Sequence, residues 1–267
     1  MKEFWETVLD FCQQTTSEVS NFLIRDFGQV SATRKADGTL VTESDRMADQ
    51  AIRQAIHDWF PTHGVLTEET EHVFPSNDWC WIVDPIDGTT NFTRGIPIWG
   101  ISLGLAFRGI PVFGYVYFPM FATAYYGYFY GDSGLEGPHQ GAYCNGKPIT
   151  TSSDAPSYNH LFNLCARSTH IMTRPFPCKL RLMGVASYNV LLVASGASLG
   201  GIEATPKVWD LAAAWVILLA AGGVIHTLDD GDTFPLQIGQ NYGERSFACL
   251  SAGNEDLFNT FLAFVRP

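Results

Sequence analysis

The sequence feature that most constrains the fold is an apolar run that stops at two acids. Residues 79–83 (WCWIV) are apolar or aromatic, and Asp84-Pro85 and Asp87-Gly88 follow directly. Proline restricts the residue before it and has no amide proton to donate, so the run predicts a buried central strand that ends at a rigid corner. Ligand sites of open α/β sheets lie beyond the carboxyl ends of such strands, so this corner is a candidate site.

Residues 1–150 are predicted to form an α+β lobe that holds most of the candidate ligands. Apolar positions recur at helical spacing over 3–26 and again after 42–45 (TESD), a match to a capping box. Three strand-like runs follow, at residues 98–107, 112–118 and 123–130. A short strand is also expected at 64–66, and Asn145-Gly146 is typical of a hairpin turn. We therefore expect helices followed by consecutive antiparallel strands.

Residues 151–267 are predicted to form an α/β lobe, because short strands and helices alternate there. The expected strands lie near residues 161–165, 201–204, 224–225 and 247–250, and the expected helices at 187–196, from Asp210, and from Asn254 to about 265. The longest apolar run, 211–225, has fifteen residues and is too short for a membrane span. It predicts a buried helix instead.

Composition restricts the partners and the compartment. The chain has 267 residues, 46% of them hydrophobic, and a net charge of −11, which disfavours binding to nucleic acid or to anionic membranes. The six cysteines include no C-x-x-C pair, and acids near the N-terminus stand where a signal peptide would carry bases. We expect a cytoplasmic protein that acts on a small molecule, with a local cation wherever an anionic substrate binds.

The two acids at the corner point to a metal ion beside a phosphate. Asp84 and Asp87 would repel each other at close range unless a cation lay between them, and oxygen ligands favour Mg²⁺. The carbonyl of Ile86 could be a further ligand. Gly88 and Thr89 then open a short helix, whose free amides suit a phosphate group. The alternative is a solvated turn, since Asp-Pro and Asp-Gly are ordinary turn pairs.

Two further acidic positions are candidates because two carboxylates cannot fill several coordination spheres. Glu68 and Glu69 follow the expected strand at 64–66, although paired glutamates are also common as surface charge. Asp210 opens the most apolar helix directly after Trp209. Its alternative role is that of a helix cap.

The motifs together resemble those of a known family. The segments that carry the resemblance are WIVDPIDGTTNF at 81–92, TEE at 67–69, WDLAAAW at 209–215, TESD at 42–45 and GAYCNGKPIT at 141–150. They are similar to the inositol monophosphatase family of Mg²⁺-dependent, lithium-sensitive phosphatases. The resemblance implies a layered α-β-α-β-α sandwich of the inositol monophosphatase and fructose-1,6-bisphosphatase type, with an antiparallel sheet in the first half. It also implies a homodimer.

The resemblance implies a role for each acid around two or three Mg²⁺ ions. Metal 1 would be bound by Glu68 and the carbonyl of Ile86, metal 2 by Asp87 and Asp210, and both by Asp84, with Glu69 supporting Glu68 from behind. The amides of Gly88 and Thr89 would hold the phosphate. Asp45 and the Thr89 hydroxyl, together with Glu68, would activate the attacking water. The alternative role of Asp45, which is compatible with the first, is that of the capping residue of its helix.

The substrate is less constrained by the sequence. Family resemblance places Gly184, Ala186 and Glu203, with Asp87 and Asp210, against the substrate, which favours inositol 1-phosphate. Fructose 1,6-bisphosphate or histidinol phosphate are alternatives, and a second phosphate would need cations such as Arg167, Arg181 or Lys207. A different class is a catalytically weak Mg²⁺-binding regulatory protein.

Two positions depart from the family pattern. Thr67 stands where a glycine commonly precedes the glutamate pair, and a β-branched residue disfavours positive φ. Ala214 stands where a glycine is expected, with the bulky Trp215 after it. We expect these changes to alter local geometry, because every implied carboxylate is present.

Overall fold

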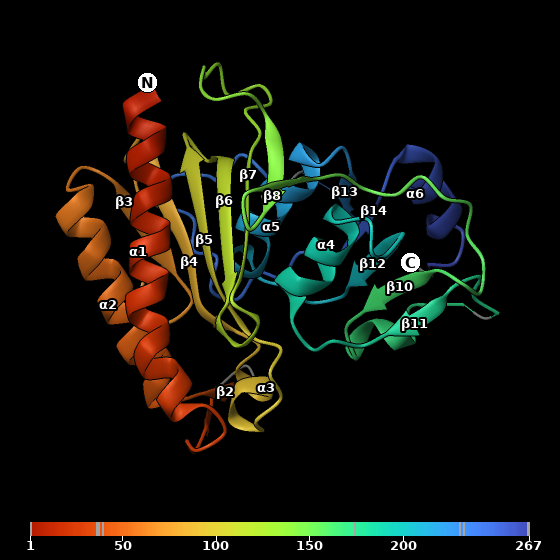
Figure 1. Ribbon diagram of the computed structural model, residues 1–267, viewed down its shortest axis with the longest axis horizontal. Helices are drawn as coiled ribbons and strands as arrows, with labels where there is room; N and C mark the ends of the chain where they lie inside the picture. The colour runs from red at the N-terminus through yellow and green to blue at the C-terminus, as the bar shows by residue number, and fades with distance from the viewer. Residues whose placement is uncertain are drawn as a thin grey trace.

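Helices and sheets alternate in five layers across the molecule (Figure 1). The computed structural model describes residues 2–35, 38, 40–173, 175–229, 231 and 233–265. Helices α1 (Lys2–Asp26) and α2 (Glu43–Trp59) cover the outer face of one sheet. Helices α4 (Ala186–Ala194) and α5 (Val208–Ala220) lie between the two sheets, and α6 (Glu255–Leu262) lies beyond the second. The predicted layered sandwich is confirmed.

The first sheet has seven strands in the order β3-β4-β5-β6-β7-β8-β9. Their bounds are β3 (Gly64–Thr67), β4 (Trp79–Asp87), β5 (Gly100–Phe107), β6 (Ile110–Phe118), β7 (Thr123–Tyr128), β8 (Gly141–Cys144) and β9 (Lys147–Ile149). All neighbours are antiparallel except β3 and β4, which run parallel. The predicted hairpins are present. Asn145 and Gly146 both adopt positive φ in the turn between β8 and β9, as a tight hairpin requires.

The second sheet has five strands in the order β11-β10-β12-β14-β13. Their bounds are β10 (Leu161–Leu164), β11 (Lys179–Arg181), β12 (Gly200–Glu203), β13 (Val224–Thr227) and β14 (Cys249–Ala252). Strand β10 runs parallel to β11 and β12, whereas β14 is antiparallel to both of its neighbours. Short elements complete the chain: β1 (Thr33–Arg34), β2 (Leu40–Val41), α3 (Thr89–Thr93), and 3₁₀ turns at Pro119–Phe121 and Arg167–His170.

Helix α5 joins the two halves of the chain because it packs directly on the first sheet. A Cβ built on Gly114 of β6 would lie 2.1 Å from the carbonyl oxygen of Ala213, and one on Gly104 of β5 would lie 3.0 Å from Cβ of Ala212. Only glycine permits so close an approach of helix to strand. The Oγ of Ser102 in β5 donates to the carbonyl of Trp209 (3.4 Å), which fixes the first turn of α5 beside the central strands.

Several expected boundaries shift. Strand β4 does not end at Asp84 but continues to Asp87, with its register against β5 shifted between these two residues. Pro85 is tolerated because the irregularity interrupts the ladder there. Helix α5 begins at Val208 rather than Asp210, and α6 ends at Leu262. The division of the chain into lobes at residue 150 stays a prediction.

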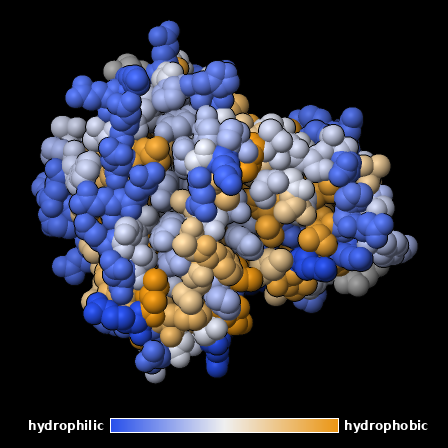
Figure 2. Space-filling model, viewed as in Figure 1, coloured by the Kyte–Doolittle hydropathy of each residue, from blue (hydrophilic) through white to orange (hydrophobic). Residues whose placement is uncertain are grey.

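The surface over α1 and α2 is mostly hydrophilic (Figure 2), as expected of helices that turn one face to solvent and one to the core. The inward residues of α1 include the fully buried Val8, Phe11 and Leu23. Among the described residues, no helix is both long enough and apolar enough to cross a membrane.

Candidate active site

Three aspartates meet at the end of β4. Asp84, Asp87 and Asp210 each offer a carboxylate oxygen, and these oxygens lie within 4.8 Å of one another. Asp84 and Asp87 flank the register shift in β4, and Asp210 is the third residue of α5. Asp84 is paired in register with Ser102, whose hydroxyl contacts the first turn of α5. Packing of α5 on the first sheet therefore brings Asp210 to the predicted corner, although it lies 123 positions beyond Asp87 in the sequence (210 − 87).

Each carboxylate of the cluster is fixed by one backbone amide. The pairs are Ile86 N–H to Asp84 Oδ1 (3.0 Å), Ser187 N–H to Asp87 Oδ2 (2.8 Å) and Lys207 N–H to Asp210 Oδ2 (2.6 Å). The last contact makes Asp210 the N3 residue of α5, so its expected capping role and its place in the cluster are compatible. One oxygen of each side chain is thus held, and the other remains available as a ligand.

Burial and mutual repulsion make the charged cluster unfavourable without a cation. Burial, followed by the nearby carboxylates, raises the pKa of Asp84 and of Asp210 well above the usual range. Burial also raises the pKa of Asp87. A set of buried oxygen donors that resists carrying its own charge fits a hard divalent ion such as Mg²⁺. The residues at this corner could therefore hold a metal ion.

Glu68 and Glu69 lie at the same corner but are paired with a lysine. Nζ of Lys35 lies 2.9 Å from Oε1 of Glu68 and 2.6 Å from Oε1 of Glu69. Burial raises the pKa of Glu68 to about 7, although Lys35 opposes that shift. Burial lowers the pKa of Lys35, but the two glutamates raise it by more. The pKa of Lys35 therefore lies above its usual value. Lys35 thus offsets part of the negative charge of this glutamate pair, and sequence reasoning did not identify it.

Thr67 supports the glutamate pair from an extended conformation rather than from positive φ. It is the last residue of β3, and its hydroxyl contacts that of Thr70 (3.1 Å). Its amide donates to the carbonyl of Glu71 (2.9 Å). Ala214, at the second departure from the family pattern, is fully buried in α5. Thr67 is therefore accommodated by hydrogen bonds of its hydroxyl and amide, and Ala214 by its burial in the core.

Asp45 and Thr89 form a hydrogen-bonded pair next to the cluster. The Thr89 hydroxyl can donate to Oδ1 of Asp45 (3.1 Å) or to the carbonyl of Ile86 (3.2 Å). The other oxygen of Asp45 accepts from the amide of Thr42 (2.7 Å), which completes the predicted capping box of α2. Asp45 therefore caps α2 with one oxygen, as expected, and contacts Thr89 with the other; its role in water activation stays a prediction.

Gly88 opens α3 exactly where the phosphate-binding turn was expected. Its φ of 97° lies in the left-handed region, which favours glycine. A Cβ there would also lie 2.6 Å from a methyl group of Val185. The turn thus leaves the amides of Gly88 and Thr89 beside the carboxylates.

A cavity of about 250 Å³ opens onto these groups. Its walls include the acids Glu68, Asp84, Asp87 and Asp210, the turn residues Ile86, Gly88 and Thr89, and also Gly184 and Arg167. The position of Arg167 beside this corner could not be predicted from the sequence, although its charge made it a candidate. Arg181, the other exposed arginine considered, lies on β11 and donates to the carbonyl of Leu180.

The expected substrate contacts are divided between cavity and core. Gly184 lines the cavity, and Ala186 is the first residue of α4, whose next amide holds Asp87. Glu203 is buried, and its Oε1 accepts from Nδ2 of Asn189 at 2.6 Å. Burial raises the pKa of Glu203 to about 7. The carboxylate of Glu203 is therefore held by Asn189, and Glu203 is not among the residues that line the cavity.

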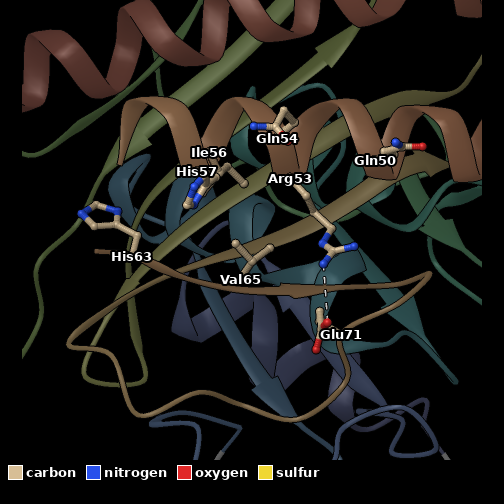
Figure 3. Close-up of a pocket in the computed structure, with 8 residues that line it drawn as sticks. All are labelled: Gln50, Arg53, Gln54, Ile56, His57, His63, Val65 and Glu71. Carbon is tan, nitrogen blue, oxygen red and sulfur yellow. Dashed lines mark ion pairs between the residues drawn. The ribbon is translucent and has the colours of Figure 1, made fainter. Parts of the chain in front are cut away.

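A larger cavity between α2 and β3 does not share this chemistry (Figure 3). Arg53 and Glu71 form an ion pair across it, with Nη2 and Oε1 3.5 Å apart. Its remaining walls include Gln50, Gln54 and the separated rings of His57 and His63. Its arginine is already paired with its single acid, Glu71, so no acids converge there, and the cavity at the end of β4 is the candidate active site.

A layered α/β fold, converging carboxylates and a glycine turn with backbone amides beside them are together typical of a phosphoric monoester hydrolase. The profile of the inositol monophosphatase family matches residues 5–260. The chain therefore belongs to the inositol monophosphatase family.

Individual relatives agree with this membership. The chain is 30% identical to the fructose-1,6-bisphosphatase/inositol-1-monophosphatase of Aquifex aeolicus, over 91% of this chain and 89% of that protein. It is 34% identical to inositol monophosphatase 1 of Solanum lycopersicum, over 72% and 73% of the two chains. The solved structure of a Thermotoga maritima IMPase superposes with a TM-score of 0.76 at 25% identity, covering 96% of this chain and 98% of that one.

Proposed function

We propose that this protein is a Mg²⁺-dependent phosphomonoesterase that hydrolyses a small polyol or sugar phosphate by attack of an activated water. Inositol 1-phosphate is the first candidate substrate. The observation that carries the proposal is the convergence of Asp84, Asp87 and Asp210 within 4.8 Å. Three apposed and buried carboxylates need either protons or a divalent cation to be stable, and the family is one of phosphatases.

The geometry of the acid cluster and the family resemblance support a proposed set of ligands. Glu68, Asp84 and the carbonyl of Ile86 would hold one ion, and Asp84, Asp87 and Asp210 a second, with two or three ions in all. When bound, Mg²⁺ supplies positive charge to the phosphate and lowers the pKa of a coordinated water. Glu69 keeps Glu68 in place through their shared partner Lys35.

The protein's own groups position the reactants. The amides of Gly88 and Thr89 bind the phosphate oxygens at the start of α3. The Thr89 hydroxyl, 3.1 Å from Asp45, orients the attacking water, and Asp45 receives the proton that this water loses. Gly184 lines the side of the site that meets the alcohol part of the ester, and Ala186 and Glu203 support that side from outside the cavity lining.

The test is release of phosphate from inositol 1-phosphate by the purified protein in Mg²⁺. EDTA should abolish turnover, and Asp84→Asn and Asp87→Ala should each reduce it by at least a hundredfold while the fold survives. The exposed Asp10→Asn provides a matched control that should leave the rate unchanged. A rate unaffected by Asp87→Ala would reject the proposed site. Lithium should inhibit by competing for a metal position.

Fructose 1,6-bisphosphate is the second candidate substrate, with histidinol phosphate as a further alternative from the same family. The specific observation in favour of fructose 1,6-bisphosphate is Arg167 in the lining of the cavity, because a second phosphate needs an extra cation. The Aquifex aeolicus relative carries both activities in its name. A panel of the three esters, compared by kcat/KM, ranks them.

A catalytically weak Mg²⁺-binding regulatory protein is the alternative from another class. It would gain thermal stability from Mg²⁺ yet release no phosphate from any ester of the panel. We also propose a homodimer in the cytoplasm, with no nucleic-acid or membrane partner, in line with the family resemblance and the net charge of −11. Sedimentation of the purified chain tests the dimer.

A further inference from the structure

Glu68 is held through its own backbone from two sides. Its amide donates to the carbonyl of Val83 (3.2 Å), the residue before Asp84. Its carbonyl contacts Nε2 of His72 (2.7 Å), four residues later in the same loop. A carbonyl oxygen only accepts hydrogen bonds, so Nε2 is the donor in this contact. The end of β4 therefore fixes one side of the Glu68 backbone, and His72 fixes the other.

The ring of His72 also contacts the start of α5. It stacks on the indole of Trp209, with the ring centroids 5.5 Å apart and an angle of 29° between the planes. Trp209 is buried and directly precedes Asp210. One imidazole therefore joins the loop of Glu68 to the first turn of the helix that carries Asp210.

The segment before β14 holds His72 against the same helix by a second route. The amide of Tyr242 donates to the carbonyl of His72 (2.8 Å). A Cβ built on Gly243 would lie 2.8 Å from Nδ1 of His72, so only glycine leaves room for the imidazole there. The carbonyl of Gly243 accepts from Nζ of Lys207 (3.0 Å), and the amide of Lys207 holds Asp210.

The space between Glu68 and α5 is partly open. Glu68, His72, Trp209 and Asp210 all line a cavity of about 380 Å³. Glu68 and Asp210 also line the active-site cavity, so the two cavities adjoin. Regions of low contact density move most easily, so the contacts that His72 makes across this space determine how closely Glu68 approaches Asp210.

We propose that His72 is a positioning residue, which raises the affinity of the acid cluster for Mg²⁺ by holding Glu68 and Asp210 at the required spacing. His72 itself binds neither metal nor substrate, because its Nε2 and one face of its ring are occupied by protein groups. Metal ligands must be held to within about 0.5 Å of their productive positions. The inference rests on the proposed function only in that the acids bind Mg²⁺, and it does not depend on which ester is hydrolysed.

Calorimetry with Mg²⁺ tests the two contacts of the ring separately. His72→Gln keeps a donor for the Glu68 carbonyl but loses the ring, and His72→Phe keeps a ring on Trp209 but loses the donor. Each should raise the Kd for Mg²⁺ about three- to tenfold, and His72→Ala, which loses both contacts, about ten- to a hundredfold. Unchanged Kd values in all three variants would overturn the inference.

His139 provides the matched controls. Its Nδ1 also contacts a backbone carbonyl at 2.7 Å, that of Gln140, but the residue is exposed and lies outside both cavities. His139→Gln and His139→Phe should therefore leave the Kd for Mg²⁺ unchanged. A rise in Kd as large as that of the His72 variants would overturn the inference, because it would not depend on the contacts of His72.

Gly243→Ala displaces the imidazole without removing it, because the added Cβ would lie 2.8 Å from Nδ1 of His72. It should raise the Kd for Mg²⁺ about three- to tenfold in the wild-type background and have no further effect in His72→Ala. An equal effect in both backgrounds would assign the change to residues 240–243 themselves and overturn the role of His72.

Kinetics separates positioning from a merely structural role. The His72 variants should need about three- to tenfold more Mg²⁺ for half-maximal hydrolysis of inositol 1-phosphate, while the KM for the ester changes less than about twofold. Variants that are less stable in EDTA but bind Mg²⁺ as wild type does would make His72 structural and the inference wrong. If wild type binds Mg²⁺ but hydrolyses no ester, the proposed function fails and the Kd values alone decide the role of His72. A wild-type chain that binds no Mg²⁺ would overturn both.

Discussion

The ammonium group of Lys35 lies 2.9 Å from Oε1 of Glu68, one of the acids implied to bind a metal ion. The same nitrogen contacts Glu69 at 2.6 Å, so one lysine neutralises part of a strongly acidic corner. A metal ion that binds Glu68 must share or displace this contact. The stability of the metal-free protein and its affinity for metal are therefore coupled through one side chain.

Lys35→Gln should destabilise the metal-free protein and strengthen Mg²⁺ binding. Loss of the ammonium leaves two largely buried glutamates without a cation, which should cost about 1–3 kcal/mol, between the values for exposed and buried pairs. Because ammonium and metal compete for the same oxygens, the Kd for Mg²⁺ should fall severalfold. Urea unfolding in EDTA and calorimetric titration with Mg²⁺ measure the two effects.

Lys179→Gln is the matched control for this prediction, since Lys179 is exposed on β11 and should change neither quantity. Weaker Mg²⁺ binding by Lys35→Gln would contradict the competition and indicate instead that Lys35 supports the metal site.

Local signals account for the part of the site that the sequence predicted. The apolar strand, the glycine at the start of α3 and the Thr42–Asp45 capping box each depend on residues close in sequence, and all are present. Asp210, the N3 residue of α5, likewise depends on a local signal, because it caps its own helix. Because each signal needs only neighbouring residues, a single sequence was sufficient to place Asp87 at the end of β4 and Asp210 in the first turn of α5, whereas β4 runs on past Asp84.

Contacts between distant segments were not predictable in the same way. Nothing near Lys35 indicates that it pairs with acids 33 and 34 positions away. The continuation of β4 through Pro85 was missed because it depends on a register shift against β5. Glu203 was expected at the substrate, but the sequence could not indicate that Asn189 holds it outside the cavity lining.

Glu203 should make the metal-free protein less stable as pH rises. Burial raises the pKa of Glu203 to about 7 in the folded chain, above the ordinary value of 4.5. Its contribution is fully present below pH 4.5 and is lost as pH rises through about 7, because the folded state binds the proton more tightly than the unfolded state. A shift of this size corresponds to at most about 3 kcal/mol.

Glu203→Gln should remove this part of the pH dependence, since Gln keeps an oxygen for Asn189 but does not titrate. Unfolding free energies of both proteins, measured in EDTA at pH 5 and pH 8, give the comparison. An equal loss of stability in wild type and variant would assign the dependence to the aspartates of the cluster.

Thr89→Val should lower kcat about a hundredfold or more while Mg²⁺ affinity changes little. The substitution removes the hydroxyl that links Asp45 to the cavity but keeps the backbone amide of residue 89 and nearly the same volume. Steady-state kinetics with inositol 1-phosphate and calorimetry with Mg²⁺ separate the two quantities. Thr93→Val, in the same helix with its hydroxyl on the carbonyl of Thr90, is the control. Comparable losses in both variants would mean that α3 was simply disturbed.

Gly114→Ala should weaken Mg²⁺ binding although Gly114 lies on β6, away from every proposed ligand. The added Cβ would lie 2.1 Å from the carbonyl of Ala213, so α5 must move away from the sheet. Overpacking of this kind costs about 1–3 kcal/mol of folding stability. Because Asp210 is in the first turn of the same helix, the movement should also displace its carboxylate from Asp84 and Asp87.

Gly141→Ala on β8 is the matched control for the Gly114 variant. Its φ is not positive, and its Cβ would meet only the side chain of Tyr143, at 3.4 Å. Thermal unfolding with and without Mg²⁺ measures both effects: the Gly114 variant should lose stability in EDTA and gain less from Mg²⁺ than the control does. A Gly114 variant that is destabilised but keeps the full gain from Mg²⁺ would show that the position of Asp210 does not depend on the seating of α5.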